Sequence, residues 1–88
     1  MNQVNIIETA QWWIGDEAIG IGNIFRSSYK LPDGTMKKGL TVTLFYREKS
    51  EVVGQGTIIE VDDEKWLVTS IKQPWFFGRG NVTFEKVK

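Results

Sequence analysis

The stretch "IGNIFRSSYKLPDGTMKKGLTVTLFY", residues 21 to 46, indicates two strands joined by a tight turn. In "PDGT" (32 to 35) the proline fixes φ, the aspartate initiates a turn and the glycine accepts positive φ. Apolar residues fall on odd positions in the strand predicted over residues 18 to 31, and on even positions in the strand predicted over residues 36 to 47. The two sets are Ile19, Ile21, Phe25, Tyr29 and Leu31, and Met36, Leu40, Val42, Leu44 and Tyr46.

A turn centred on Asp33 and Gly34 pairs odd positions of the first strand with even positions of the second. Leu31 then faces Met36, Phe25 faces Val42 and Ile21 faces Tyr46, so that all the apolar side chains share one face of the hairpin. On the reverse face we expect basic side chains, and Phe45 covering Gly22 across the strands. The predicted basic hairpin face consists of Arg26, Lys30, Lys37 and Arg47.

Further strands are predicted on both sides of this hairpin. "TIIEV" (57 to 61) and "WLVTSI" (66 to 71) flank the polar turn "DDEK" (62 to 65), which makes Val61 face Trp66 and Ile59 face Val68. Ile71 falls out of phase, which indicates a bulge near Ser70. "NVTFEKV" (81 to 87) forms the last strand with Val82 and Phe84 inward, "QVNII" (3 to 7) the first, and "AQWWI" (10 to 14) adds another.

Three segments share the form Gly-x-Gly followed by a polar and a β-branched residue: "GIGNI" (20 to 24), "GQGTI" (54 to 58) and "GRGNV" (78 to 82). A phosphate-binding loop needs a helix after its glycines, and no helix is predicted after any of these. The glycines instead indicate strands that bend sharply. The sequence therefore predicts an all-β fold, a small antiparallel barrel of five or six strands (an SH3-like or OB-like roll), with a compact β-sandwich as the alternative.

The composition excludes several classes of protein. Eighty-eight residues hold one core, so residues 1 to 88 are expected to form a single domain. The chain has no cysteine and no histidine, which removes disulfides, the usual zinc sites and the commonest catalytic groups. Asp62, Asp63 and Glu64 lack the ligand spacing of a calcium loop and indicate a solvated turn. We expect no catalytic residue, cofactor or metal.

The hydropathy of the chain and its first ten residues predict a cellular compartment. No apolar run approaches the ~20 residues that a membrane span requires. The start "MNQVNIIETA" lacks the features of a signal peptide. We therefore expect a cytoplasmic protein with no membrane partner.

The net charge is zero, but the charges are unevenly spread. Residues 26 to 49 hold six of the eleven basic residues against two acidic ones, a net charge of +4, which leaves −4 for the rest of the chain. Such a charge separation orients an anionic partner, or one copy of the protein against another.

The segment "KQPWFFGRGN" (72 to 81) places three consecutive rings between a proline and two glycines. A regular strand cannot bury Trp75, Phe76 and Phe77 on one face, so one of them is expected to be a contact residue and the others structural. The same argument makes Trp12 and Trp13 point in opposite directions. Exposed rings beside an arginine such as Arg79 are typical of protein interfaces.

The sequence predicts a non-enzymatic small binding module that acts through an aromatic protein–protein interface, with self-association as one form of it. Size and fold class suggest, by analogy, an accessory or adaptor protein of phage or mobile-element type. The alternative is binding of a nucleotide or single-stranded nucleic acid through exposed rings and the basic hairpin face. The partner contacts are Trp12, Trp13, Trp75, Phe76, Phe77 and Arg79, and the anion contacts are Arg26, Lys30, Lys37 and Arg47.

Overall fold

A computed structural model describes residues 3–8, 10–73 and 79–87. Within these residues the chain forms eight strands and no helix, which confirms the all-β class with more strands than predicted. The strands are β1 (Gln3–Ile7), β2 (Gln11–Ile14), β3 (Glu17–Lys30), β4 (Met36–Tyr46), β5 (Lys49–Gly54), β6 (Ile58–Val61), β7 (Glu64–Lys72) and β8 (Asn81–Val87).

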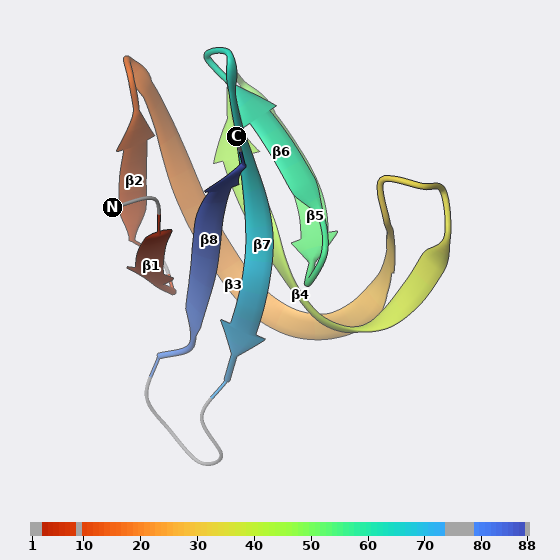
Figure 1. Ribbon diagram of the computed structural model, residues 1–88. Helices are drawn as coiled ribbons and strands as arrows, with labels where there is room; N and C mark the ends of the chain where they lie inside the picture. The colour runs from red at the N-terminus through yellow and green to blue at the C-terminus, as the bar shows by residue number, and fades with distance from the viewer. Residues whose placement is uncertain (1–2, 9, 74–78, 88) are drawn as a thin grey trace.

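The strands form two antiparallel sheets of four strands each, shown one in front of the other in Figure 1. The first sheet has the order β1-β8-β7-β6 and the second has the order β2-β3-β4-β5. In the described part of the chain no strand of one sheet pairs with a strand of the other, and no closed barrel is found.

The facing sides of the two sheets share one hydrophobic core. Ile19 and Leu44 enter it from the second sheet, and Val68 enters it from the first. Val82 and Phe84 on β8 are completely buried, which confirms their predicted inward orientation. Alternation of side chains along the strands therefore accounts for most of the core, because apolar residues occupy every second position where the two sheets face each other.

The turn between β3 and β4 is one residue longer than predicted. The N–H of Leu31 donates to the carbonyl of Thr35 (2.8 Å) and the N–H of Gly34 to the carbonyl of Leu31 (2.9 Å), so the loop is Pro32 to Gly34. The N–H of Thr35 donates to Asp33 Oδ1 (2.9 Å), and this bond lowers the pKa of Asp33. The carboxylate that accepts the bond therefore persists at neutral pH, and the bond weakens only as the pH falls through the lowered pKa.

This longer loop shifts the register of the whole hairpin. Lys30 pairs with Met36, and Ile24, not Phe25, pairs with Val42. The predicted inward orientation of Phe25 is wrong, because a one-residue shift moves a side chain to the opposite face of the sheet. Phe25 is accordingly exposed, and Ile24 takes the core position.

A β-bulge between Ile21 and Ile24 shifts the register a second time. Ile21 pairs with Leu44, not with Tyr46 as predicted. Because two one-residue shifts restore the original phase, Ile21 still faces the core as the sequence indicated. Before the bulge the odd-numbered residues of β3 face the core, and after it the even-numbered residue Ile24 does so.

The second hairpin also has a different turn from the predicted one. Asp62 and Asp63 both have positive φ (52° and 65°), as in the two-residue turn that matches the twist of a hairpin. Ile59 therefore pairs with Trp66, which corrects the predicted register by two residues and leaves the inward faces unchanged. The predicted irregularity near Ser70 is confirmed, because the pairing of β7 with β8 shifts between Val68 and Ser70.

Each of the three Gly-x-Gly motifs contains a glycine against which another group packs. A Cβ on Gly22 would lie 2.7 Å from Phe45 Cε2, which confirms that the Phe45 ring covers this glycine. A Cβ on Gly54 would meet the ring of Tyr29, and one on Gly80 would lie 2.5 Å from the carbonyl oxygen of Lys72. These contacts support the steric interpretation of the motifs.

The carboxylate of Glu8, at the corner between β1 and β2, holds the two sheets together. It accepts hydrogen bonds from the N–H of Ile24 on β3 and from the N–H of Gly80 before β8, both at 3.0 Å. Ile24 lies beyond the residues of β3 that pair with β2, so its N–H needs an acceptor from elsewhere. The side-chain amide of Gln73 donates to the Ile24 carbonyl (3.2 Å) from the same region.

Alanine substitutions at Gly34 and Gly39 distinguish the effect of backbone conformation on stability from the effect of steric crowding. A Cβ meets nothing within 4 Å at either glycine, but only Gly34 has positive φ (92°). We expect Gly34→Ala to lower the free energy of unfolding by about 1–2 kcal/mol, since positive φ is unfavourable for alanine. Gly39→Ala should change it by less than about 0.5 kcal/mol in urea denaturation. Equal effects would place the turn elsewhere.

Replacing Glu8 tests the corner between the sheets. Glutamine has one carbonyl oxygen, so Glu8→Gln leaves one of the two N–H groups facing an amide donor. We expect a loss of about 1–3 kcal/mol in the free energy of unfolding. The matched control is Glu60→Gln on the exposed side of β6, which should cost less than about 0.5 kcal/mol. A Glu8 variant as stable as this control would contradict the proposed role of the carboxylate.

Candidate functional site

The second sheet turns most of its non-core side to solvent, and we call this side the outer face. At one end of it Thr41 and Gly54 are buried, and the Tyr29 ring covers Gly54. Register places the outer-face residues in rows across the strands: Gln11 pairs with Gly20, Gly20 with Phe45, and Phe45 with Ser50. Trp13 pairs with Ala18 in the next row. On the other side of the Phe45 row, Thr43 pairs with Val52, and beyond it Phe25 pairs with Thr41.

Four large apolar side chains are exposed on this outer face. They are Trp13 (60% exposed), Phe45 (51%), Val52 (43%) and Phe25 (40%). These make up four of the seven exposed large hydrophobic residues in the described part of the chain. Single exposed apolar residues are common, but several on one face indicate an interaction surface.

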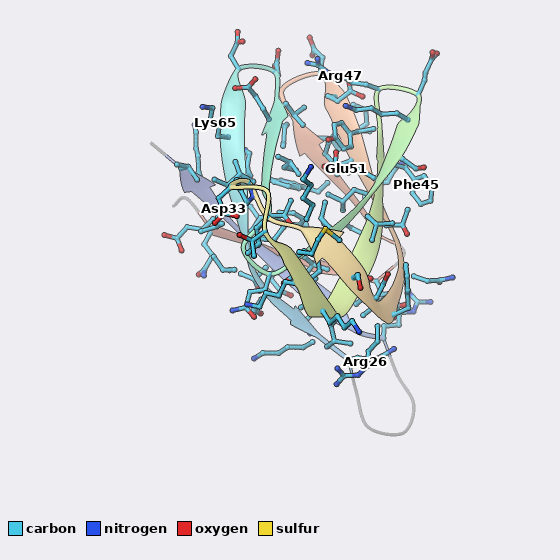
Figure 2. All side chains as sticks on the ribbon, turned by 90° about the vertical axis from the view of Figure 1, so that its right-hand side faces the viewer. Arg26, Asp33, Phe45, Arg47, Glu51 and Lys65 are labelled. Carbon is cyan, nitrogen blue, oxygen red and sulfur yellow. The ribbon has the colours of Figure 1, made fainter. Side chains whose placement is uncertain are left out.

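The surface between Trp13 and Phe45 is low. β3 lies between β2 and β4, and its outer-face residues there are Ala18 and Gly20. No large side chain of β3 therefore stands between the two exposed rings. The Phe45 ring points away from the body of the protein, as Figure 2 shows, and it leans over Gly22.

A shallow hollow lies beside Ala18, at the turn between β4 and β5. Its lining includes Ala18 and Phe45, together with four charged residues that we call the rim: Glu17, Arg47, Glu48 and Lys49. Arg47 Nε lies 3.6 Å from Glu17 Oε1, and the Arg47 N–H donates to Glu17 Oε2 (3.1 Å). The rim therefore carries two acidic and two basic side chains.

Tyr46 closes the inner side of this hollow. Its hydroxyl donates a hydrogen bond to Glu51 Oε2 at 2.7 Å. Burial, and then the Glu51 carboxylate, raises the pKa of Tyr46 above its usual value. The phenol therefore stays protonated and serves as a fixed hydrogen-bond donor rather than as a base.

The outer face of the first sheet is different in character. There the Asn5 side-chain amide donates to Asn81 Oδ1 (2.9 Å) and to Thr83 Oγ1 (2.8 Å). These polar groups satisfy one another on a solvated surface. The apolar outer face of the second sheet therefore has no equivalent on the first sheet at this position.

The two neighbouring tryptophans of β2 have opposite orientations, as predicted. Trp12 points to the core, where its ring lies 4.7 Å from Trp66 and 4.9 Å from Phe84, measured between ring centroids. Trp13 points to the outer face. The structure thus brings Trp13 into the candidate site and makes Trp12 part of the core.

Of the other predicted partner contacts, only Arg79 falls within the described residues, and it is not part of this face. Trp75, Phe76 and Phe77 lie outside the described residues. Arg79 is exposed beside Gly80, which contacts Glu8 near Ile24. Trp13 pairs with Ala18, six residues from Ile24 along β3, which corresponds to roughly 20 Å of strand. Trp13 and Arg79 therefore do not form one patch.

The predicted basic hairpin face is divided by the observed register. Arg26 and Lys30 share one face, whereas Lys37 pairs with Tyr29 on the opposite face. Arg47 lies in the turn between β4 and β5, and Figure 2 shows it at the opposite end of the protein from Arg26. The prediction of one face for the four residues is wrong, because it depended on the incorrect turn and on a strand without a bulge.

Sequence reasoning missed Phe25 and Val52 as members of the outer face, and treated Phe45 only as a cover for glycine. The signal for Phe45 was present, since an aromatic residue that covers a glycine stays on the solvent side of the sheet. Phe25 required knowledge of the bulge. The first Gly-x-Gly motif indicated a bend at this point, since a glycine inside a strand often marks a bulge, but it did not show that the register would shift.

Comparison of the chain with protein-family models, with curated proteins and with solved structures finds no match. In the residues that the structure describes, no helix is long and apolar enough to cross a membrane. The same residues contain no group of three or more acidic, histidine or cysteine side chains arranged to hold a metal ion.

The two tryptophans of β2 provide a matched pair of substitutions. We expect Trp12→Ala to lower the free energy of unfolding by about 3 kcal/mol, because the core loses the ring that contacts Trp66 and Phe84. Trp13→Ala should change it by less than about 0.5 kcal/mol, because its ring is mainly in solvent. Urea unfolding followed by circular dichroism measures both. The reverse order would place Trp13 in the core.

Proposed function

We propose that this protein is a non-enzymatic binding module, and that the outer face of the second sheet docks on a second copy of the chain. The observation that supports this most strongly is the gathering of Trp13, Phe25, Phe45 and Val52 on one side of one sheet. Large rings in the centre of an interface contribute most of its binding energy. Ala18 and Gly20, the small residues between Trp13 and Phe45, would let a ring of the partner approach the sheet.

The rim supports a second copy as the occupant. Glu17, Glu48, Arg47 and Lys49 include equal numbers of each charge. In a two-fold arrangement the same patch meets itself, so an acidic residue of one copy can face a basic residue of the other. A partner of one predominant charge would gain little from such a mixed rim.

The alternative function, binding of a nucleotide or single-stranded nucleic acid, requires rings and cations on one surface. Phe25 lies on the outer face, whereas its neighbour Arg26 and the cation Lys30 lie on the opposite face of the hairpin. A base stacked on the outer-face rings would therefore be remote from these cations. Lys37 shares the face of Phe25, and Arg47 and Lys49 lie in the rim beside Phe45. Because Arg47 is paired with Glu17 and the rim also holds Glu48, the surroundings of the rings favour a protein partner.

The proposal also covers the architecture of the domain and its role in the cell. Two unjoined sheets around a shared core favour the compact β-sandwich over the SH3-like or OB-like roll. A role as a cytoplasmic accessory or adaptor protein of phage or mobile-element type is consistent with a small all-β domain, by analogy.

Substitution of the outer face tests the interface. We expect the unaltered protein to form dimers at micromolar concentration, and Trp13→Ser with Phe45→Thr to weaken dimerisation at least about tenfold, because the central rings are lost. Analytical ultracentrifugation over a range of concentrations measures this. Raising the salt concentration should weaken dimerisation only slightly, since exposed rim ion pairs contribute little and the centre of the interface is apolar.

The control variant is Ile7→Ser with Ile58→Thr, which removes two exposed apolar side chains from the first sheet. It should dimerise like the unaltered protein. A protein that stays monomeric at high concentration, or a control variant that loses dimerisation equally, would rule out this face as the dimer interface.

A further inference from the structure

A second surface lies on the side of the β3–β4 hairpin opposite Phe25. Register places Ser28 directly across from Lys38, with Arg26 and Lys30 two residues away from Ser28 in either direction along β3. We propose that these four residues, which we call the hairpin anion site, bind a phosphate group. The site is independent of the proposed protein interface, since the two use opposite faces of the hairpin.

The spacing suits a single oxyanion. Directly opposed residues have Cβ atoms about 5 Å apart, and residues two apart along a strand are separated by about 7 Å. Three long cationic side chains therefore surround the Ser28 hydroxyl at distances from which all can reach one ligand. Arginine and lysine donate charge-assisted hydrogen bonds to phosphate oxygens, and a serine hydroxyl adds a neutral donor.

The surface at this point is open and concave. Arg26, Ser28, Lys38 and Gly39 line a shallow hollow together with Ser27. The Ser27 hydroxyl is engaged, since it donates to the carbonyl of Ser28 (3.3 Å). In the described residues no hydrogen bond to the Ser28 hydroxyl is found, so it is available to a ligand. Gly39 pairs with Ser27 next to the Ser28–Lys38 pair, and it adds no side chain to the hollow.

Within the part of the chain that the structure describes, no ion pair neutralises the positive charge of the site. The ion pairs within the described residues are Arg47 with Glu17 and Lys86 with Glu64, and neither involves the hairpin anion site. Residues 25 to 41 contain four basic residues and one aspartate, a net charge of +3. Like charges held this close repel one another, and a bound anion removes that repulsion.

Lysines on a hairpin also prevent edge-to-edge aggregation, which needs no ligand. That role requires only charge on exposed edges, and it predicts weak, unlocalised attraction of anions. A phosphate site predicts binding that is confined to Ser28 and its neighbours. The two interpretations therefore differ in where an anion is found.

A titration followed by two-dimensional NMR of the full chain locates the anion. The probes are inorganic phosphate, adenosine monophosphate and a twelve-residue oligothymidylate, each added at low salt. We expect backbone amide shifts to be confined to residues 26 to 30 and 36 to 40. Tighter binding of the oligonucleotide than of the monophosphate identifies a nucleic-acid backbone as the source of the phosphate, and equal binding identifies a small phosphate ester.

Paired variants test the residues. Arg26→Gln with Lys38→Gln should weaken binding of the tightest probe at least tenfold and reduce the salt dependence by about one for each cation removed. The control removes two exposed lysines from β7, Lys65→Gln with Lys72→Gln, and should change binding less than twofold. Neither variant is expected to lower the melting temperature, because these side chains make no ion pair within the described residues.

The proposal is overturned by any of three results. These are no shift with all three probes, shifts of similar size at the lysines of β7 and of the hairpin, or equal weakening in the two paired variants. The oligomeric state measured by ultracentrifugation is a separate readout. A monomeric protein that still binds phosphate at the hairpin would contradict the proposed dimer and leave the hairpin anion site supported.

Discussion

The carboxylate of Glu8 accepts one hydrogen bond from each sheet, and this pair of bonds fixes the geometry of the molecule at the corner between β1 and β2. One donor is the N–H of Ile24 on β3, and the other is the N–H of Gly80 at the entry to β8. Ile24 also marks the end of the β3 bulge. By holding Ile24 in place, Glu8 fixes the point at which the core-facing residues of β3 change from odd-numbered to even-numbered positions.

The bulge has consequences for both candidate sites. Before it, odd residues of β3 face the core, and after it Ile24 does so and Phe25 turns outward. Phe25 thereby extends the apolar outer face, while Arg26 and Lys30 are turned to the other side of the hairpin. In a strand without the bulge, Phe25 would lie on the core side of the sheet, and Arg26 and Lys30 would lie on the outer side. One extra residue therefore separates an apolar surface from a basic one.

The candidate sites could be predicted only in part. The opposite orientations of Trp12 and Trp13 follow from alternation alone, and the excess of basic residues between positions 26 and 49 is visible in the sequence. Which tryptophan joins the core depends on Trp66 and Phe84, which lie on the other sheet and far along the chain. The grouping of Arg26 with Lys38, rather than with Lys37, depends on the length of a turn.

The sequence by itself determined the all-β class, the main strands and the inward residues of β8, because these follow from the two-residue period of local side-chain alternation. Tertiary structure decided the registers, the division into two sheets and the faces on which Phe25 and Lys37 lie. The physical reason is that "PDG" is compatible with loops of different length, whose energies differ little locally. The choice between them is made by long-range contacts, among them the hydrogen bonds of Glu8 and the contact of Tyr29 with Gly54.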